Sequence, residues 1–73
     1  MGFLCERMRS LREDRDLSQK DIAAVLNTTQ QVYSRYENGN NEVPIHHLIT
    51  LSRFYNVSID YIVGETDVKD RYK

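Results

Sequence analysis

The sequence predicts an all-α protein, a single compact domain of five helices. Apolar residues recur every three or four positions along most of the chain, which is the period of a helix rather than of a strand. Residues typical of helix starts and helix ends flank these apolar segments: Ser18, Thr29, Ser58, Gly39 and Gly64. The length of 73 residues suits one domain, which we expect over residues 1–65.

The first two helices are expected over residues 3 to about 14 and about 19 to 26. The apolar face of the first comprises Leu4, Met8 and Leu11. Asp16 then interrupts the helical pattern, and Ser18, followed three residues later by an acid, has the form of an N-cap. Asn27 stands where a left-handed residue would end the second helix, a conformation that asparagine tolerates well.

The third helix is expected to begin at Gln30, after the N-cap Thr29, and to end at Gly39. Pro44 is predicted in the first turn of the fourth helix, where its missing N–H costs nothing. Ser58 is predicted to cap a short fifth helix that Gly64 ends. The apolar face of the third helix comprises Tyr33 and Tyr36, and that of the fourth comprises Leu48, Leu51 and Tyr55 with Phe54 alongside. The fifth helix contains Ile59, Tyr61 and Ile62. The charged tail of residues 66–73 is expected to fray.

Composition narrows the function classes. Cys5 is the single cysteine, so no disulfide can form within the chain, and we expect a cytoplasmic protein with no membrane span, export signal or cofactor. The net charge of −1 argues against a partner held by bulk charge, so any basic face must be local. His46 and His47 are predicted to be surface residues rather than metal ligands, because adjacent helix positions diverge by about 100°. No spacing of nucleophile, base and acid indicates an enzyme.

The segment from 19 to 38 predicts a helix-turn-helix. Its two helices are joined by about three residues, too few for antiparallel packing but suited to a crossing of roughly 90–120°. In such a motif the second helix is exposed along one side and fits the DNA major groove. Within that helix, Gln30 and Gln31 stand side by side in the first turn. A glutamine amide offers donors and an acceptor in one plane, which can pair with adenine N6 and N7.

These residues resemble the Cro/cI-like (Xre) family of helix-turn-helix regulators, the group that includes the lambdoid phage repressors. The resemblance covers nearly the whole chain, from LREDRDLSQKDIAAVLNTTQQVYSRYENGN through VPIHHLITLSRFYNVSIDYIVG. It implies a lambda-repressor-like DNA-binding domain. Asn27 and Asp16 replace glycines that are usual in the family, but both residue types tolerate positive φ, so the same fold is expected.

The resemblance also implies roles for individual residues. It assigns base contacts to Gln30, Gln31 and Arg35. It assigns contact with the DNA backbone, or bracing of the contact residues, to Gln19, Thr29, Ser34, Asn38 and Asn40. Among these, Gln19 matches a side chain that meets a phosphate and can brace Gln30. Arg12 and Glu37 match a buried ion pair that ties the first helix to the end of the recognition helix; the alternative is two separate surface charges.

The function that follows is a sequence-specific regulator of transcription that binds double-stranded DNA, most simply a repressor. We expect a homodimer on a palindromic operator, with half-sites about 10 base pairs apart. Tyr61, Ile62 and Val63 are candidates for the dimer seam, or alternatively ordinary core. A second hypothesis is an antitoxin or adaptor that uses the same fold mainly to hold a protein partner. For the two glutamines, the alternative to base readout is a solvated helix surface.

Overall fold

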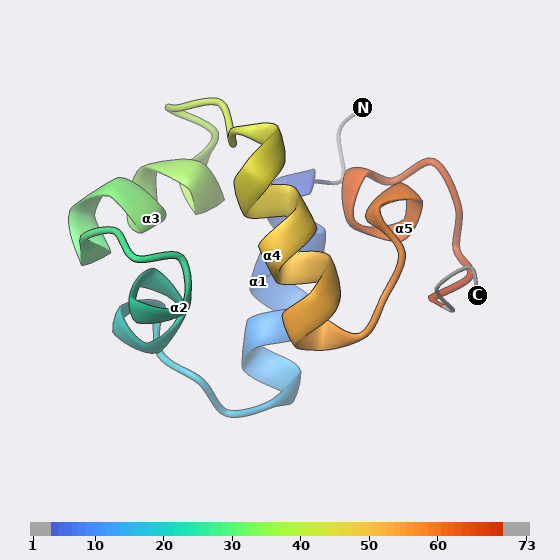
Figure 1. The fold of residues 1–73 in the computed structure, drawn as a ribbon, viewed down its shortest axis with the longest axis horizontal. Coiled ribbons are helices and arrows are strands. Elements are labelled where there is room, and N and C mark those ends of the chain that lie inside the picture. Colours follow the sequence, from blue (N-terminus) through green and yellow to red (C-terminus); the bar gives the residue numbers. More distant parts are fainter. Residues whose placement is uncertain (1–3, 70–73) are drawn as a thin grey trace.

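A computed structural model of the protein describes residues 4–69. Within them lie five helices and no strand: α1 (Leu4–Asp14), α2 (Gln19–Val25), α3 (Gln30–Asn38), α4 (Ile45–Tyr55) and α5 (Ile59–Val63). Figure 1 shows α4 crossing in front of α1 at the centre, with α2 and α3 on one side and α5 on the other. The predicted all-helical fold is confirmed. The expected first helical residue, Phe3, lies outside the described residues.

Local capping and turn residues explain where α2 and α3 begin and where the first three helices end. The Ser18 hydroxyl accepts a hydrogen bond from the Asp21 backbone N–H at 3.0 Å, and the Asp21 carboxylate accepts one from the Ser18 N–H at 2.9 Å. This reciprocal pair satisfies two N–H groups that the start of α2 would otherwise leave unpaired. Asp16 and Asn27 take positive φ values of 55° and 57°, and Gly39 ends α3 at 79°. The predicted turn chemistry is confirmed.

The start of α4 differs from the sequence prediction, and its end had not been predicted. Pro44 has φ −60° and ψ 150°, so it is the N-cap residue and the helix starts only at Ile45. A proline ring fixes φ alone, and the φ it imposes suits both the cap and the first turn. The far end of α4 is closed by Asn56 at φ 57°, an end signal that the sequence analysis did not use. Phe54 remains 37% exposed rather than joining the apolar face.

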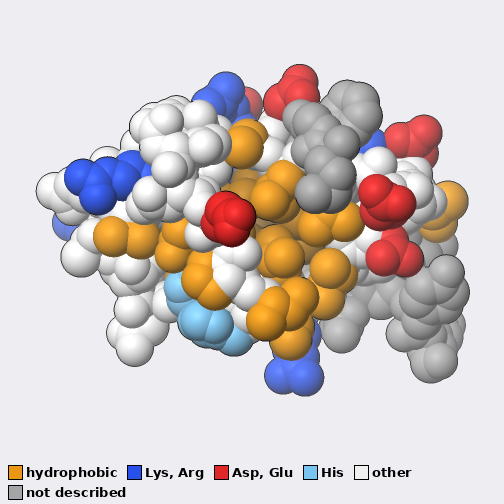
Figure 2. All heavy atoms as spheres, turned by 90° about the horizontal axis from the view of Figure 1, so that it is seen from above, with side chains coloured by type: hydrophobic (Ala, Val, Ile, Leu, Met, Phe, Trp, Pro, Cys, Tyr) orange, Lys and Arg blue, Asp and Glu red, His pale blue; other side chains and the backbone are white. Residues whose placement is uncertain are grey.

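One core holds the five helices together. Its buried apolar residues are Met8, Leu11, Ile22, Ala23, Leu26, Tyr33, Tyr36, Leu48, Leu51, Tyr55, Val57 and Ile62. Ala23 of α2 is 2% exposed in this core, and a larger side chain there would overpack it. Apolar side chains also reach the surface: Figure 2 shows them at the centre of the face seen from above, beside the histidines. Ile45 and Ile49 of α4 are among the exposed large apolar residues.

The beginning of the charged tail is bonded to the domain. The guanidinium of Arg7 donates to the Tyr61 carbonyl at 2.9 Å and the Thr66 carbonyl at 3.1 Å, and it pairs with Asp67 at 2.9 Å. The Ser58 N–H donates to the Lys69 carbonyl at 3.0 Å. Residues 66–69 thus contact the domain, the fraying of the tail stays a prediction, and residues 70–73 lie outside the described residues.

Candidate nucleic-acid interface

The connection between α2 and α3 turns the chain within residues 26–29. Asn27 takes the left-handed conformation, and the Thr28 N–H donates to the Ala23 carbonyl at 2.9 Å, which closes the C-terminus of α2. Thr29 then caps α3, because its hydroxyl accepts the Val32 N–H at 3.2 Å. The Thr29 hydroxyl hydrogen is left to donate elsewhere. The two helices pack directly on each other, as a helix-turn-helix requires.

Opposite faces of α3 have opposite character. Tyr33 and Tyr36 are 0% and 7% exposed, and their rings meet edge to face with centroids 6.4 Å apart. Gln30, Gln31 and Arg35 are exposed on the other side. This division follows from the 3.6-residue period of the helix. The buried tyrosines fix the rotation of α3 about its axis, so its polar face is held toward solvent.

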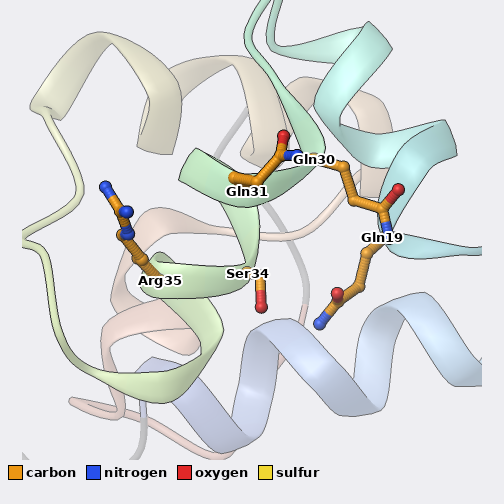
Figure 3. Close-up of a pocket in the computed structure, with 5 residues that line it drawn as sticks. All are labelled: Gln19, Gln30, Gln31, Ser34 and Arg35. Atoms are coloured by element: carbon orange, nitrogen blue, oxygen red, sulfur yellow. The ribbon is translucent and has the colours of Figure 1, made fainter.

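Five of the predicted contact residues surround one shallow hollow on the polar side. They are Gln19, Gln30, Gln31, Ser34 and Arg35 (Figure 3). Gln30 extends toward Gln19 of α2, whereas Arg35 projects from the other end of the group. The hollow therefore carries amide donors and acceptors along most of its length and a guanidinium at one end. These are groups that pair with base edges and with phosphate oxygens.

The remaining predicted backbone contacts lie at the ends of α3 and outside the hollow. Thr29 precedes the helix, and Asn38 and Asn40 flank Gly39 at its C-terminus; all three are exposed. The Asn40 N–H donates to the Arg35 carbonyl at 2.9 Å, which holds the following loop against the helix end. The structure thus places these three residues at the ends of α3 rather than around the hollow.

Arg12 and Glu37 form an ion pair between α1 and α3. The Arg12 Nε and Nη2 atoms lie 2.7 and 3.1 Å from the two Glu37 carboxylate oxygens, and Nη1 donates to the Leu17 carbonyl at 2.9 Å. The Glu37 side chain is 0% exposed and that of Arg12 is 13% exposed. Burial alone would raise the pKa of Glu37, but the hydrogen bonds that its carboxylate accepts, above all those from Arg12, outweigh it and hold that pKa below its ordinary value.

Two further side chains reach the same carboxylate, and the sequence analysis missed both contacts. Gln19 Nε2 donates to Glu37 Oε1 at 3.2 Å, and Arg9 Nε lies 3.6 Å from the same oxygen. Gln19 is therefore bonded to the end of α3, and its expected bracing of Gln30 stays a prediction. The three-residue spacing of Arg9 and Arg12 places them on one helix face and could have indicated the Arg9 contact. No local pattern indicates the Gln19 contact.

The histidine pair is closer together than predicted. The rings of His46 and His47 lie with centroids 4.2 Å apart, and the His47 ring also meets Tyr36 edge to face at 5.8 Å. His47 is half-buried, and burial followed by the neighbouring His46 lowers its pKa. The part of the chain described by the structure contains no group of three His, Cys, Asp or Glu residues suited to a metal ion. Within the same residues, no helix has the length and apolar character needed to cross a membrane.

The three residues considered for a dimer seam differ in exposure. Ile62 is 0% exposed and belongs to the core, so it offers no surface to a partner. Tyr61 and Val63 are half-buried, and each packs against the core with part of its side chain in solvent. Arg7 covers the Tyr61 ring at 4.0 Å from its centroid. Ile62 is therefore an ordinary core residue and not part of a dimer seam.

Comparison with known proteins identifies the class that this fold and surface define. The helix-turn-helix family model matches residues 8–62, and the chain belongs to that family. The match spans α2 and α3 together with most of the core, and it confirms the resemblance seen in the sequence. The family is a class of DNA-binding regulators rather than of enzymes.

The chain is similar to several individual regulators. It is 36% identical to the uncharacterized HTH-type transcriptional regulator YobD of Bacillus subtilis, over 90% of this chain and 59% of YobD. It is 30% identical to the cryptic phage CTXphi transcriptional repressor RstR of Vibrio cholerae (92% and 62%), and 35% identical to antitoxin PezA of Streptococcus pneumoniae (82% and 38%). A transcriptional regulator from Listeria innocua superposes with a TM-score of 0.81 at 30% identity, over 84% of this chain and 57% of that one. The chain thus spans less than two thirds of each.

Proposed function

We propose that this chain is the sequence-specific DNA-binding domain of a cytoplasmic transcriptional regulator, most simply a repressor that blocks a promoter by occupying it. The observation that carries the proposal is the polar face of α3, where Gln30, Gln31 and Arg35 are exposed beside Gln19. The buried tyrosines on the other side of α3 fix the orientation of the helix about its axis. A helix displayed in this way fits the major groove, where each base pair presents its own pattern of donors and acceptors.

Within this proposal the exposed residues divide into two groups. Gln30, Gln31 and Arg35 read base edges, the amides preferring adenine and the guanidinium preferring guanine. Residues at the two ends of α3 and in its flank contact the DNA backbone, namely Thr29, Ser34, Asn38 and Asn40. Their hydroxyl and amide groups can donate to phosphate without adding formal charge, which suits a chain of net charge −1.

The operator is proposed to be a palindrome read by two copies of the chain. One helix-turn-helix contacts only a few base pairs, so half-sites one helical turn apart, about 34 Å, would give a dimer the length of site it needs. Tyr61 and Val63 are the proposed contacts between copies, because both keep exposed surface on α5. Sedimentation of the chain on a full operator should give two copies per duplex, and a one-to-one complex that persists at high protein concentration would exclude the dimer.

The test of DNA recognition starts by selecting bound sequences from random duplexes. Gln30→Ala and Gln31→Ala are then titrated on the selected operator and on a scrambled duplex of equal length. Each loss of a base contact should cost about 1–3 kcal/mol on the operator and almost nothing on the scrambled duplex. Ser10→Ala, an exposed change on α1, is the control. Equal losses on both duplexes would show that the two glutamines do not read bases.

A second candidate function is that of an antitoxin or adaptor, and the similarity to antitoxin PezA favours considering it. In that case the fold would serve mainly to hold a protein partner. A selection that enriches no duplex sequence, together with a stable protein complex recovered from the native host, would favour this function over the first. Enrichment of a defined operator would favour the regulator.

A further inference from the structure

Two arginines of α1 approach one buried carboxylate. Arg12 holds both oxygens of Glu37, with its Nε and Nη2 atoms at 2.7 and 3.1 Å. Arg9 reaches the same group only through its Nε atom, which lies 3.6 Å from Oε1, too far for a hydrogen bond. Glu37 carries one negative charge and the two arginines carry two positive charges. The group therefore has one more cation than the carboxylate neutralises.

Arg9 is the surplus cation of this group. Its side chain is 47% exposed, against 13% for that of Arg12. A guanidinium carries five N–H donors in a planar fork, and among the residues that the structure describes none accepts a hydrogen bond from Arg9. Moving Arg9 away from Glu37 would cost little, because Arg12 would still hold both carboxylate oxygens.

The surplus charge lies next to the hollow that Gln19 lines. The Gln19 Nε2 atom donates to Glu37 Oε1 at 3.2 Å, so Arg9 and Gln19 meet at the same oxygen atom. Helix α1 packs against α3. In Figure 3, α1, drawn in pale blue, runs beside the labelled residues on the side toward which the Gln19 and Ser34 side chains point. Arg9 therefore borders the proposed DNA-facing surface.

A phosphate oxygen is the partner that this guanidinium suits. When a helix enters the major groove, the phosphates at the edge of the groove come next to the residues that flank the helix. Arginine can bind phosphate through two parallel N–H···O bonds and needs no particular base to do so. The weak attraction to Glu37 also keeps Arg9 close to the hollow before DNA arrives, which reduces the side-chain freedom lost on binding.

We propose that Arg9 is a DNA-backbone contact supplied by α1, from outside the helix-turn-helix. On binding, its guanidinium turns from Glu37 to a phosphate at the edge of the groove, while Arg12 keeps Glu37 neutralised. This contact adds affinity on any duplex and no preference between sequences. The inference rests on the proposed DNA-binding function and gives a role in it to a residue that the sequence analysis left without one.

The test compares two replacements of Arg9. Arg9→Gln keeps hydrogen-bonding groups and removes the charge, whereas Arg9→Lys keeps the charge. Each variant is titrated on the selected operator and on the scrambled duplex between about 50 and 200 mM salt, at a temperature where thermal unfolding shows it to be folded. Arg53→Gln, which changes an exposed arginine on α4, is the matched control because it alters the net charge by the same amount.

The measured quantity is the slope of log affinity against log salt concentration. Arg9→Gln should reduce this slope by about 0.9 on both duplexes and leave the ratio of operator affinity to scrambled-duplex affinity unchanged. Its loss of affinity should therefore be about 3.5-fold larger at 50 mM than at 200 mM salt. Arg9→Lys should keep most of the wild-type slope, and Arg53→Gln should leave the slope nearly unchanged.

Operator duplexes that carry a single neutral methylphosphonate locate the contact. At one phosphate for each bound copy, the replacement should weaken binding by the wild-type protein and leave binding by Arg9→Gln unchanged. Equal slopes for these two proteins, or equal methylphosphonate losses at every position, would overturn the inference. So would an unchanged slope with a lower melting temperature, which would limit Arg9 to supporting Glu37. A wild-type protein that binds no duplex would instead defeat the proposed function, and this inference with it.

Discussion

Replacing Arg12 by alanine should destabilise the fold far more than an ordinary surface change. The substitution removes both hydrogen bonds that the guanidinium donates to Glu37 and the one that it donates to the Leu17 carbonyl. Glu37 would remain in the core, 0% exposed, and would keep the bond from Gln19 and the longer contact to Arg9. A buried charge that loses its partner cannot regain the hydration it gave up on folding.

The magnitude follows from this burial. Breaking one side of a buried pair typically costs about 3–5 kcal/mol, and the two remaining donors favour the lower end. A domain of 73 residues has a total stability of about 4–11 kcal/mol, so the loss would be a large share of it. At about 3 kcal/mol the melting temperature should fall by roughly 12–24 °C. Arg53→Ala, an exposed arginine on α4, is the matched control and should stay within about 0.5 kcal/mol.

The pH dependence of this loss tests its cause. In the wild-type protein the pKa of Glu37 is lowered on folding, so its stabilising effect is present above the unfolded pKa and is lost as pH falls through the folded one. Without Arg12, burial raises that pKa instead, and stability is then lost as pH rises through it. The difference in the free energy of unfolding between the wild-type protein and Arg12→Ala should therefore narrow from pH 7 to about pH 4. An unchanged melting temperature, or a gap independent of pH, would refute the buried ion pair.

Three further changes should act through local structure, each measured by thermal or urea unfolding. Gly39→Ala should cost about 1–2 kcal/mol because φ is 79°; the new Cβ would lie 3.6 Å from Cys5 Sγ, an ordinary contact, so a larger loss would contradict a purely conformational origin. Ser52→Ala should cost about 1–3 kcal/mol, since it leaves the buried Val57 carbonyl without its 2.6 Å bond, and a neutral result would mean that water replaces the hydroxyl. Thr29→Ala should cost about 1 kcal/mol by removing the cap of α3, and Thr29→Ser should restore it.

The sequence predicted the parts of the fold whose causes are local. Thr29 and Gly39 bound α3 because a cap acts within three residues and a left-handed end depends on one residue. The inward tyrosines followed from helical spacing in the same way. The Pro44 error has a local cause too: the proline ring fixes φ but not ψ, and the ψ of 150° keeps Pro44 out of the helix.

Contacts between distant residues were beyond the same reasoning. Arg7 meets Asp67 across 60 positions, and Arg15 donates to the Tyr55 carbonyl across 40. Separations of this size follow no helical or strand period, so only the folded structure reveals them. One of them joins Arg7 of α1 to Asp67 in the predicted tail. The Gln19 contact with Glu37 is of this kind. The family resemblance predicted that Glu37 pairs with Arg12, whereas nothing in the sequence indicated that Gln19 also contacts Glu37.

The sparse charge of the proposed DNA surface sets how its binding should respond to salt. Among the residues that line the hollow, Arg35 alone carries a positive charge; the others are amides and a hydroxyl. Each cation that neutralises a phosphate adds about 0.9 to the slope of log affinity against log salt concentration, whereas amides and backbone N–H groups add none. A chain of net charge −1 should therefore show a shallow slope on scrambled duplex and keep most of its operator preference as salt rises. If affinity and preference instead collapse together between 50 and 200 mM salt, phosphate attraction rather than the amides would account for recognition, and the glutamines of α3 would lose the role proposed for them.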